Sequence, residues 1–423
     1  SYAVSPYDGA VRIQEMKQMV LALHSRGIGV IMDVVFNHTY RRDDSNLQKI
    51  VPGYYYRSDE TGYTNGSGCG NEVASDRPMV QKLIVDSLIY WAKEYHIDGF
   101  RFDLMGVLDI DTMNVIAERL KEIRPDIYLY GEGWNGGPSS LAEEKRAFKA
   151  SAKKMPGIGM FNDDIRDTIK GSVFYDDHLG FVNGGTHLEN ALRYGITGAV
   201  AHPQVDYDAY GSRPWAKEPG QSINYVSCHD NYTLWDKLSV SCPEASEEKK
   251  KAMNRLCAAI VFTSQGVPFI QAGEEFLRSK PLPEKKGFAE NSYNMPDAVN
   301  SIKWDNIHEY PDMIAYYKGL MALRKAHPVF RMQSEAEMTQ NLCFLSDTPE
   351  NVVAYLLKGK GADDTPENIL VIFNGNDEEI LYNLPEGKWK ILVDDKTAGA
   401  DGKKNISEKT DVEPLSALVL EKE

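Results

Sequence analysis

Apolar, strand-like segments alternate with amphipathic, helix-like segments along residues 1–328, and this alternation limits the fold more than any other feature. The strand-like segments are 27–38, 97–104, 127–134, the first part of 157–171, 223–231 and 266–275. The helix-like segments are 10–26, 78–95, 111–125, the second part of 157–171, 246–264 and 313–328. Strands that are apolar throughout, separated by helices, are typical of a parallel sheet covered by helices. A (β/α)₈ TIM barrel needs eight such strands, so we expect an α/β barrel whose front strands are missing from this chain.

The pattern of apolar residues changes after residue 328. The segments "NVVAYLLKG", "NILVIFNG", "WKILVDD" and "ALVLEKE" are short and strand-like, and clusters of Gly, Asp, Asn and Pro separate them. Closely spaced short strands with turn signals between them are typical of an all-β domain. The sequence therefore predicts a barrel domain over 1–328 and a C-terminal β-sandwich domain over 329–423.

The composition and charge of the chain disfavour several classes of partner and of site. The net charge of −15 and the pI of about 5.2 disfavour nucleic acid and acidic substrates, and fit a neutral ligand. The five cysteines are odd in number and form no CxxC pair, so neither a disulfide framework nor a zinc site is predicted. No apolar run is long enough to span a membrane. The first residues, "SYAVSPYDGA", resemble a loop from the middle of a protein, and the compartment stays open.

Polar side chains gather where the predicted strands end. In "DGFRFDLMG" the period of a strand places Arg101 and Asp103 on one face and Phe100 and Phe102 on the other. The other strand ends carry Asp33, Asn37, His38, Glu132, Trp134, His229, Asp230 and Asn231. A single acid in this position is commonly a helix cap or one half of an ion pair. Carboxylates at three separate strand ends are different, because burying them unpaired costs several kcal/mol each. The set as a whole therefore indicates an active site.

Three carboxylates with two histidines and an arginine, and without metal-binding spacing, suit glycoside hydrolysis. A retaining enzyme needs one carboxylate as nucleophile and one carboxylic acid as proton donor. An arginine beside the nucleophile keeps it ionised, whereas the acid needs a drier environment. A third carboxylate can hold sugar hydroxyls. Trp134 offers an apolar surface or a platform for a sugar ring, and packing at the surface is an equally good explanation for it.

The segments "DVVFNHT" (33–39), "GFRFDLMG" (99–106), "YGEGW" (130–134) and "NYVSCHDN" (224–231) resemble, in order and spacing, the four signature regions of the α-amylase superfamily. "PGIGMFNDDIRDTIKG" (156–171), "INYVSCHDNYTLWDKL" (223–238) and "NSYNMPDAVNSIKW" (291–304) are similar to the type I pullulanases in particular. The resemblance covers roughly 1–330, and Phe36 stands where the superfamily often has Tyr.

Carried over residue by residue, the resemblance implies the following roles. Asp103 is the nucleophile, Glu132 the general acid/base and Asp230 the stabiliser of the transition state. His38, Arg101 and His229 line the sugar subsite, Asn231 is a further binding residue, and Asp33 is structural. Trp134 is added as a binding residue from its position two residues after Glu132.

The resemblance also implies an activity. It is the cleavage of α-1,6-glucosidic bonds in pullulan or branched α-glucans, which is starch debranching, with retention of configuration. Isoamylase-type or glycogen debranching, and glucan transfer, share the same four regions and stay open. A non-catalytic glucan-binding protein on the same barrel would be expected to lack a carboxylate, and none is missing.

Cofactors and partners follow from the same resemblance. The hydrolysis needs no cofactor, and no metal site is assigned. A structural calcium ion is compatible with the superfamily, with candidate acid pairs at Asp43/Asp44, Asp163/Asp164 and Asp176/Asp177. The "YNWGYDP"-type segment that pullulanases carry ahead of the stretch resembling "SYAVSPYDGA" is absent, with the first strands. We therefore expect an N-terminal remainder that supplies the missing strands and carbohydrate-binding modules.

Overall fold

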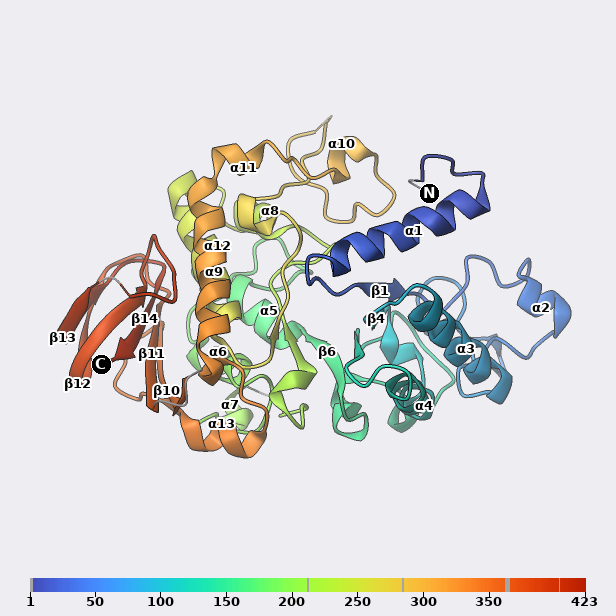
Figure 1. The fold of residues 1–423 in the computed structure, drawn as a ribbon, viewed down its shortest axis with the longest axis horizontal. Helices are drawn as coiled ribbons and strands as arrows, with labels where there is room; N and C mark the ends of the chain where they lie inside the picture. Colours follow the sequence, from blue (N-terminus) through green and yellow to red (C-terminus); the bar gives the residue numbers. More distant parts are fainter. Residues whose placement is uncertain (1–2, 211–212, 284, 362–365, 403) are drawn as a thin grey trace. The chain divides into compact units, whose positions relative to one another are not determined.

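The computed structural model describes residues 3–210, 213–283, 285–361, 366–402 and 404–423. The chain folds into two compact units, Ser1–Phe161 and Asn162–Glu423. Figure 1 shows their helices and strands in order along the chain. Over the described residues, no helix has the length and apolar character that crossing a bilayer requires.

The first unit is built on parallel strands in the order β1-β4-β5-β6. They are β1 (Ile31–Val34), β4 (Gly99–Phe102), β5 (Tyr128–Gly131) and β6 (Ile158–Asn162), which ends one residue into the second unit. The long helices of this unit are α1 (Gly9–His24), α3 (Pro78–Glu94) and α4 (Ile110–Lys121). Shorter elements are α2 (Asn46–Ile50), β2 (Ser58–Asp59), β3 (Gly62–Tyr63), η1 (Met105–Val107), η2 (Glu143–Lys145) and η3 (Lys149–Lys154).

Local sequence signals explain the two helices that cover this sheet. Helix α3 begins with Pro78, whose fixed φ suits the first helical position. Helix α4 begins after Asp109, whose side chain accepts a hydrogen bond from the backbone N–H of Thr112. Both helices bury one apolar face, which includes Leu88 of α3 and Ile116 of α4. This burial anchors both helices on the sheet.

The second unit contains the parallel pair β7 (Ser222–Asn224) and β8 (Val267–Pro268) and most of the helices. The helices are α5 (Asp163–Lys170), α6 (Glu189–Ile196), α7 (Tyr207–Tyr210), α8 (Leu234–Ser241), α9 (Glu247–Thr263), α10 (Asp297–Asn300), α11 (Asn306–Glu309), α12 (Pro311–Ala326) and α13 (Glu335–Asn341). The 3₁₀ turns are η4 (Pro219–Gln221), η5 (Glu274–Phe276) and η6 (Pro328–Phe330). Helices α9 and α12 pack on each other, and α9 also contacts the C-terminal sheet (Figure 1).

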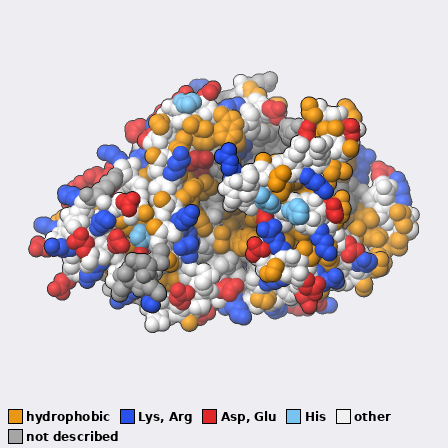
Figure 2. Space-filling view, viewed as in Figure 1, with side chains coloured by type: hydrophobic (Ala, Val, Ile, Leu, Met, Phe, Trp, Pro, Cys, Tyr) orange, Lys and Arg blue, Asp and Glu red, His pale blue; other side chains and the backbone are white. Residues whose placement is uncertain are grey.

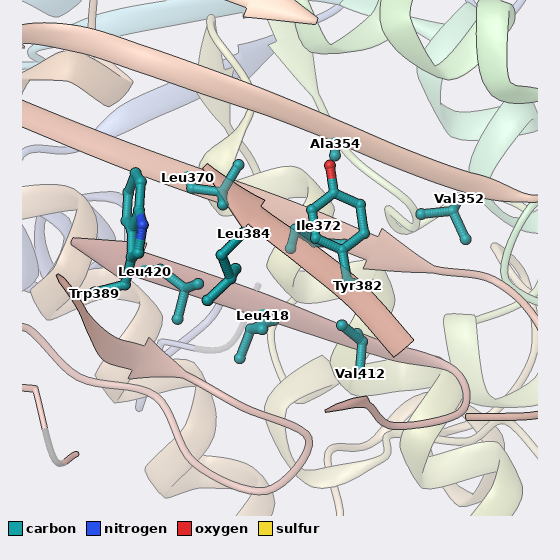
Figure 3. Packing of buried hydrophobic residues seen from close by; sticks show 10 residues of the cluster. All are labelled: Val352, Ala354, Leu370, Ile372, Tyr382, Leu384, Trp389, Val412, Leu418 and Leu420. Atoms are coloured by element: carbon teal, nitrogen blue, oxygen red, sulfur yellow. The ribbon is translucent and has the colours of Figure 1, made fainter. Parts of the chain in front are cut away.

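The C-terminal strands form one antiparallel sheet in the order β13-β12-β14-β11-β10-β9. They are β9 (Leu342–Phe344), β10 (Val352–Lys360), β11 (Pro366–Asn374), β12 (Ile380–Val393), β13 (Asn405–Val412) and β14 (Ser416–Lys422). Figure 3 shows the apolar cluster that holds this sheet, in which Trp389 lies near Leu370 and Leu420. Register shifts in β12 between Asn383 and Lys388 let this long strand bend.

The fold-class prediction is confirmed: the chain has the parallel strands of a partial barrel, followed by an antiparallel β domain. The strands counted from the sequence correspond to β1, β4, β5, β6, β7 and β8. The boundary between 328 and 329 stays a prediction. On the face shown in Figure 2, acidic and basic side chains are interspersed, so the net negative charge forms no single acidic patch there.

Candidate active site

Arg101 is the centre of the polar cluster at the strand ends of the first unit. It lies near the end of β4, and 5% of its surface is exposed. Its Nη1 is 2.8 Å from Oδ1 of Asp33 and 2.9 Å from Oδ1 of Asp103, and its Nη2 is 2.7 Å from Oε1 of Glu132. One guanidinium therefore binds carboxylates that follow or belong to three neighbouring strands.

The register of the sheet explains this convergence. Asp33 on β1 is the direct partner of Arg101 on β4, which is in turn the partner of Tyr130 on β5. Glu132 directly follows β5, and its backbone N–H donates to the carbonyl of Phe102 at 3.1 Å. Phe102 itself is fully buried. The predicted contact between Arg101 and Asp103 is thus present, because strand parity points both side chains away from the phenylalanine face.

Glu132 receives a second hydrogen bond from an unusual backbone position. Leu104 has φ 38° and ψ 50°, in the left-handed region that non-glycine residues rarely adopt. This conformation ends β4 abruptly and directs the N–H of Leu104 to Oε2 of Glu132 at 2.8 Å. Glu132 is 6% exposed, and both of its oxygens accept hydrogen bonds, one of them from a cation. This arrangement fixes the orientation of the Glu132 side chain.

Asn37 joins the nucleophile candidate to a histidine. The Nδ2 of Asn37 donates to the carbonyl of Asp103 at 2.8 Å and to Oδ2 of Asp103 at 2.9 Å. Its Oδ1 lies 2.6 Å from Nδ1 of His38. Asn37 is fully buried, and both oxygens of Asp103 are therefore occupied, one by Arg101 and one by Asn37. The sequence placed Asn37 at a strand end but gave it no role.

The charges in this cluster act on Arg101 together. Burial disfavours the guanidinium charge, but Glu132, Asp33 and Asp103 outweigh it and raise the pKa of Arg101 above its ordinary value. One cation thus faces three carboxylates. Two of these, Asp103 and Glu132, are held near each other because they bind two nitrogens of the same guanidinium, and a retaining glycosidase needs about 5–5.5 Å between its two carboxyl groups.

Trp134 lies beyond β5 and is partly buried. Its ring centroid is 6.5 Å from that of Phe161, which also lies 5.8 Å from the guanidinium carbon of Arg101. Trp134 therefore packs in part against another aromatic ring. Its role as a platform for sugar stays a prediction.

The second unit brings together His229, Asp230 and Asn231 beyond β7. Nε2 of His229 is 3.4 Å from Oδ2 of Asp230, and both side chains are exposed. Asn231 has a positive φ of 59°. Its carbonyl accepts a hydrogen bond of 2.5 Å from Nζ of Lys280, which is 1% exposed and whose pKa is lowered by burial. Lys280 thus fixes the turn that carries Asp230, a role that the sequence did not indicate.

A buried glutamate, Glu274, accepts a hydrogen bond from the same segment. Ser227 donates to Oε2 of Glu274 at 2.5 Å, and Tyr317 donates to Oε1 at 3.0 Å. Burial raises the pKa of Glu274 to about 7. Glu274 begins η5, and its place at the end of the strand predicted over 266–275 was the one signal in the sequence that could have identified it.

Of the acid pairs that the sequence offered as calcium ligands, Asp43 and Asp44 form ion pairs with neighbouring arginines. Asp43 and Asp44 pair with Arg42 at 2.7 Å and Arg41 at 3.5 Å. Within the described residues, one group of three potential metal ligands lies close together, and it is elsewhere, in the second unit. A calcium site stays a prediction.

Comparisons with known proteins agree with the resemblance seen in the sequence. Residues 339–397 match the family described as "Pullulanase, all-beta domain". The pullulanase of Bacillus subtilis (strain 168) is 42% identical over 396 residues, which are 93% of this chain and 53% of that protein.

Solved structures give the same result. The pullulanase from Bacillus acidopullulyticus superposes with a TM-score of 0.92 at 42% identity and covers 100% of this chain, which spans 50% of that structure. The type I pullulanase from B. subtilis str. 168, complexed with maltose, gives a TM-score of 0.91 at 39% identity, with 100% and 57% covered. The chain thus spans about half the length of the relatives that it matches.

Proposed function

The chain belongs to the pullulanase family, and from this premise we propose that it carries the catalytic centre of a debranching glycoside hydrolase. The reaction is the cleavage of α-1,6-glucosidic linkages in pullulan and branched α-glucans, with retention of configuration. The observation that carries the proposal is the single guanidinium of Arg101 that joins Asp103 to Glu132. It holds two carboxyl groups close together at neighbouring strand ends, as a retaining mechanism requires.

In the first step, Asp103 attacks the anomeric carbon while Glu132 gives a proton to the glycosidic oxygen that leaves. The product is a covalent glycosyl-enzyme. In the second step, Glu132 takes a proton from water, and the resulting hydroxide displaces Asp103 from the sugar. Arg101 and Asn37 suit Asp103 to its role, because both of its oxygens receive donated hydrogen bonds that hold the attacking group in a fixed orientation.

The proposed role of Glu132 requires that it carry a proton when the substrate is bound. Both of its oxygens accept hydrogen bonds, from Arg101 and from Leu104, and each oxygen has a second lone pair that can carry the proton. The contact to Leu104 is fixed by the backbone, whereas Arg101 has two other carboxylates to bind. We therefore propose that the contact between Arg101 and Glu132 is the one that weakens when Glu132 carries its proton, because protonation removes the charge that attracts Arg101.

We assign the remaining residues to the substrate. Asp230 stabilises the positively charged sugar of the transition state, and His38, Arg101 and His229 bind the hydroxyls of that sugar. Asn231 and Trp134 contribute to the same binding region. An α-glucan is neutral, so the acidic charge of this protein does not repel it.

We also propose that β1 pairs with further strands of a longer polypeptide. Among the described strands, β1 is hydrogen-bonded to β4 on one side, and it forms the edge of its sheet. Ile31 and Val35 are 41% and 53% exposed beside this edge, and Ile13 and Leu21 of α1 border a shallow depression. An exposed apolar sheet edge normally pairs or is covered. The relatives, which are about twice as long, have room for those strands.

Digestion of pullulan by the full-length polypeptide that contains residues 1–423 tests the activity. We expect maltotriose as product, and we expect Asp103→Asn to abolish turnover, because an amide cannot act as the nucleophile. Asp126→Asn is the matched control, since Asp126 is exposed on the surface and pairs with Arg124. Cleavage of amylose without cleavage of pullulan would refute the proposal. A preference for glycogen would indicate an isoamylase-type enzyme, and products longer than the donor would indicate transfer.

A further inference from the structure

Three potential metal ligands lie together in the second unit, and none of them belongs to the candidate active site. They are His327, directly after α12, Glu367 on β11 and Glu421 on β14. One ligand atom from each lies within 4.8 Å of the other two. They are far apart in the sequence, so no sequence motif predicts that they lie together.

The topology of the β domain creates this cluster. Glu421 is the direct partner of Ile369, and Glu367 is two residues before Ile369, so both acids lie on one face of the sheet. On its other side Glu367 is paired with Gly359 of β10. A Cβ at Gly359 would lie 2.6 Å from Val329, so glycine is what lets η6, and His327 with it, pack down beside Glu367.

The cluster is buried and its hydrogen bonding is incomplete. The side chains of His327 and Glu367 are 8% and 5% exposed, and Glu421 is half-buried. Nδ1 of His327 binds Oε1 of Glu367. Nε2 of His327 and Oε2 of Glu367 are both buried without a hydrogen-bond partner. A buried carboxylate oxygen without a donor is unfavourable, and two carboxylates on the same face make it more so.

We propose that His327, Glu367 and Glu421 bind a divalent transition-metal ion of the Zn²⁺ type. One imidazole nitrogen and two carboxylates neutralise a 2+ charge and suit Zn²⁺, whereas Ca²⁺ prefers oxygen ligands alone. Tetrahedral Zn²⁺ holds its ligand atoms about 3.4 Å apart, so an ion that enters this cluster replaces the hydrogen bond between His327 and Glu367 and needs only small shifts of the three side chains. A water molecule reaching the half-buried Glu421 supplies the fourth ligand.

The position of this site determines what the ion does. It joins the end of α12 and the start of η6 to two central strands of the C-terminal sheet, and it touches none of the proposed catalytic residues. Bound metal therefore stabilises the junction between the last long helix and the β domain. Because an ion that binds only the folded state raises stability by mass action, its removal lowers the melting temperature and leaves the catalytic chemistry unchanged.

The test uses the untagged full-length polypeptide, freed of metal with EDTA. Calorimetric titration with ZnCl₂, and metal analysis after gel filtration, measure the stoichiometry. Co²⁺ in place of Zn²⁺ gives a visible absorption spectrum that reports on the geometry of the ligands. The informative variant is Glu421→Gln, because this residue is half-buried and its replacement is compatible with folding, and His327→Gln is the second. The matched control is Glu379→Gln, an exposed acid of the same domain.

We expect one equivalent of Zn²⁺ in the wild type and in the control, and at least a tenfold weaker affinity in Glu421→Gln and in His327→Gln. Zn²⁺ should raise the melting temperature of the wild type by a few degrees and leave that of Glu421→Gln unchanged. The proposal is overturned if the wild type binds no Zn²⁺, or if Glu421→Gln binds it as tightly as the wild type does. In either case His327 and Glu367 form a simple hydrogen-bonded pair.

Discussion

Replacing Arg101 with methionine tests the arrangement on which the proposed active site depends. Methionine is similar in length to arginine and carries no charge, so the change removes the guanidinium and leaves the volume largely filled. Asp103 and Glu132 then face each other without the cation that binds both of them in the wild type. Asp33 loses the same partner, but its side chain is 47% exposed and water can replace the contact.

The size of the effect follows from burial. The side chains of Arg101 and Glu132 are 6% and 8% exposed, and that of Asp103 is 24% exposed. Removing one partner of a buried ion pair costs about 3–5 kcal/mol. Asp103 and Glu132 also lose the contact that orients them for the reaction. If the transition state loses the same free energy, kcat/KM falls roughly 10²–10⁴-fold.

The loss of stability should also depend on pH, with a definite sign. Two carboxylates that lie close together without a cation cannot both stay ionised, so the folded variant takes up a proton that the unfolded chain has released. The folded state then binds more protons than the unfolded state, and stability falls as pH rises. The deficit of Arg101→Met relative to the wild type should therefore be smaller at pH 5 than at pH 8.

Urea denaturation of the full-length polypeptide at pH 5 and pH 8, with pullulan hydrolysis as the second assay, measures these effects. Arg101→Lys should be intermediate, because an ammonium keeps the charge but cannot bind three carboxylates with the geometry of a guanidinium. Arg119→Met, at an exposed position on α4, is the control for removing one arginine. Equal unfolding midpoints for Arg101→Met and the wild type at pH 8, or a deficit that is the same at both pH values, would refute this reasoning.

Three further predictions concern positions outside that ion pair. Burial raises the pKa of Glu274 to about 7, so its ionisation lowers stability progressively from pH 4.5 to 7, by up to about 3 kcal/mol. Denaturation curves should show that Glu274→Gln abolishes this decline, and an unchanged decline would exclude Glu274 as its source. Asn37→Ala should lower kcat roughly tenfold to a hundredfold in pullulan assays, and Asn37→Asp should lower it further by placing a charge against Asp103. Trp389→Ala should cost about 3–5 kcal/mol in denaturation at unchanged kcat, and altered kcat would link the β domain to catalysis.

Much of the fold could be predicted because its signals are local. The helix predicted over 78–95 is Pro78–Glu94, and the helix predicted over 313–328 is Pro311–Ala326. Helix α3 begins at the predicted Pro78, a start signal that lies within the segment itself, whereas α12 begins at Pro311, two residues before the predicted segment. Strand β13 (Asn405–Val412) was not predicted, because most of its residues are exposed and polar. It is a strand only because β12 offers it hydrogen bonds, and a pairing between distant segments leaves no local trace.

The same distinction applies to the candidate site. The acids and Arg101 could be identified because each stands at the end of an apolar strand, and the contact between Arg101 and Asp103 follows from parity within one strand. Asn37 acts on Asp103, 66 residues away, and Lys280 acts on Asn231, 49 residues away. The sequence shows these residues but not their partners. Positioning residues of this kind become visible only when the register between strands is known.

The surroundings of Glu132, the proposed proton donor, include a backbone donor as well as a charged side chain. A dry position alone would favour its protonated form, and Glu132 is indeed buried. Arg101 and the left-handed backbone of Leu104 both oppose this, since each donates to one of its oxygens. Of these donors, the backbone N–H cannot move away without straightening the turn that ends β4, whereas the guanidinium already shares its charge with Asp33 and Asp103. The contact with Arg101 is therefore the one that we expect to change on substrate binding, and a substrate that draws Arg101 towards Asp103 would leave Glu132 free for its proposed role as proton donor.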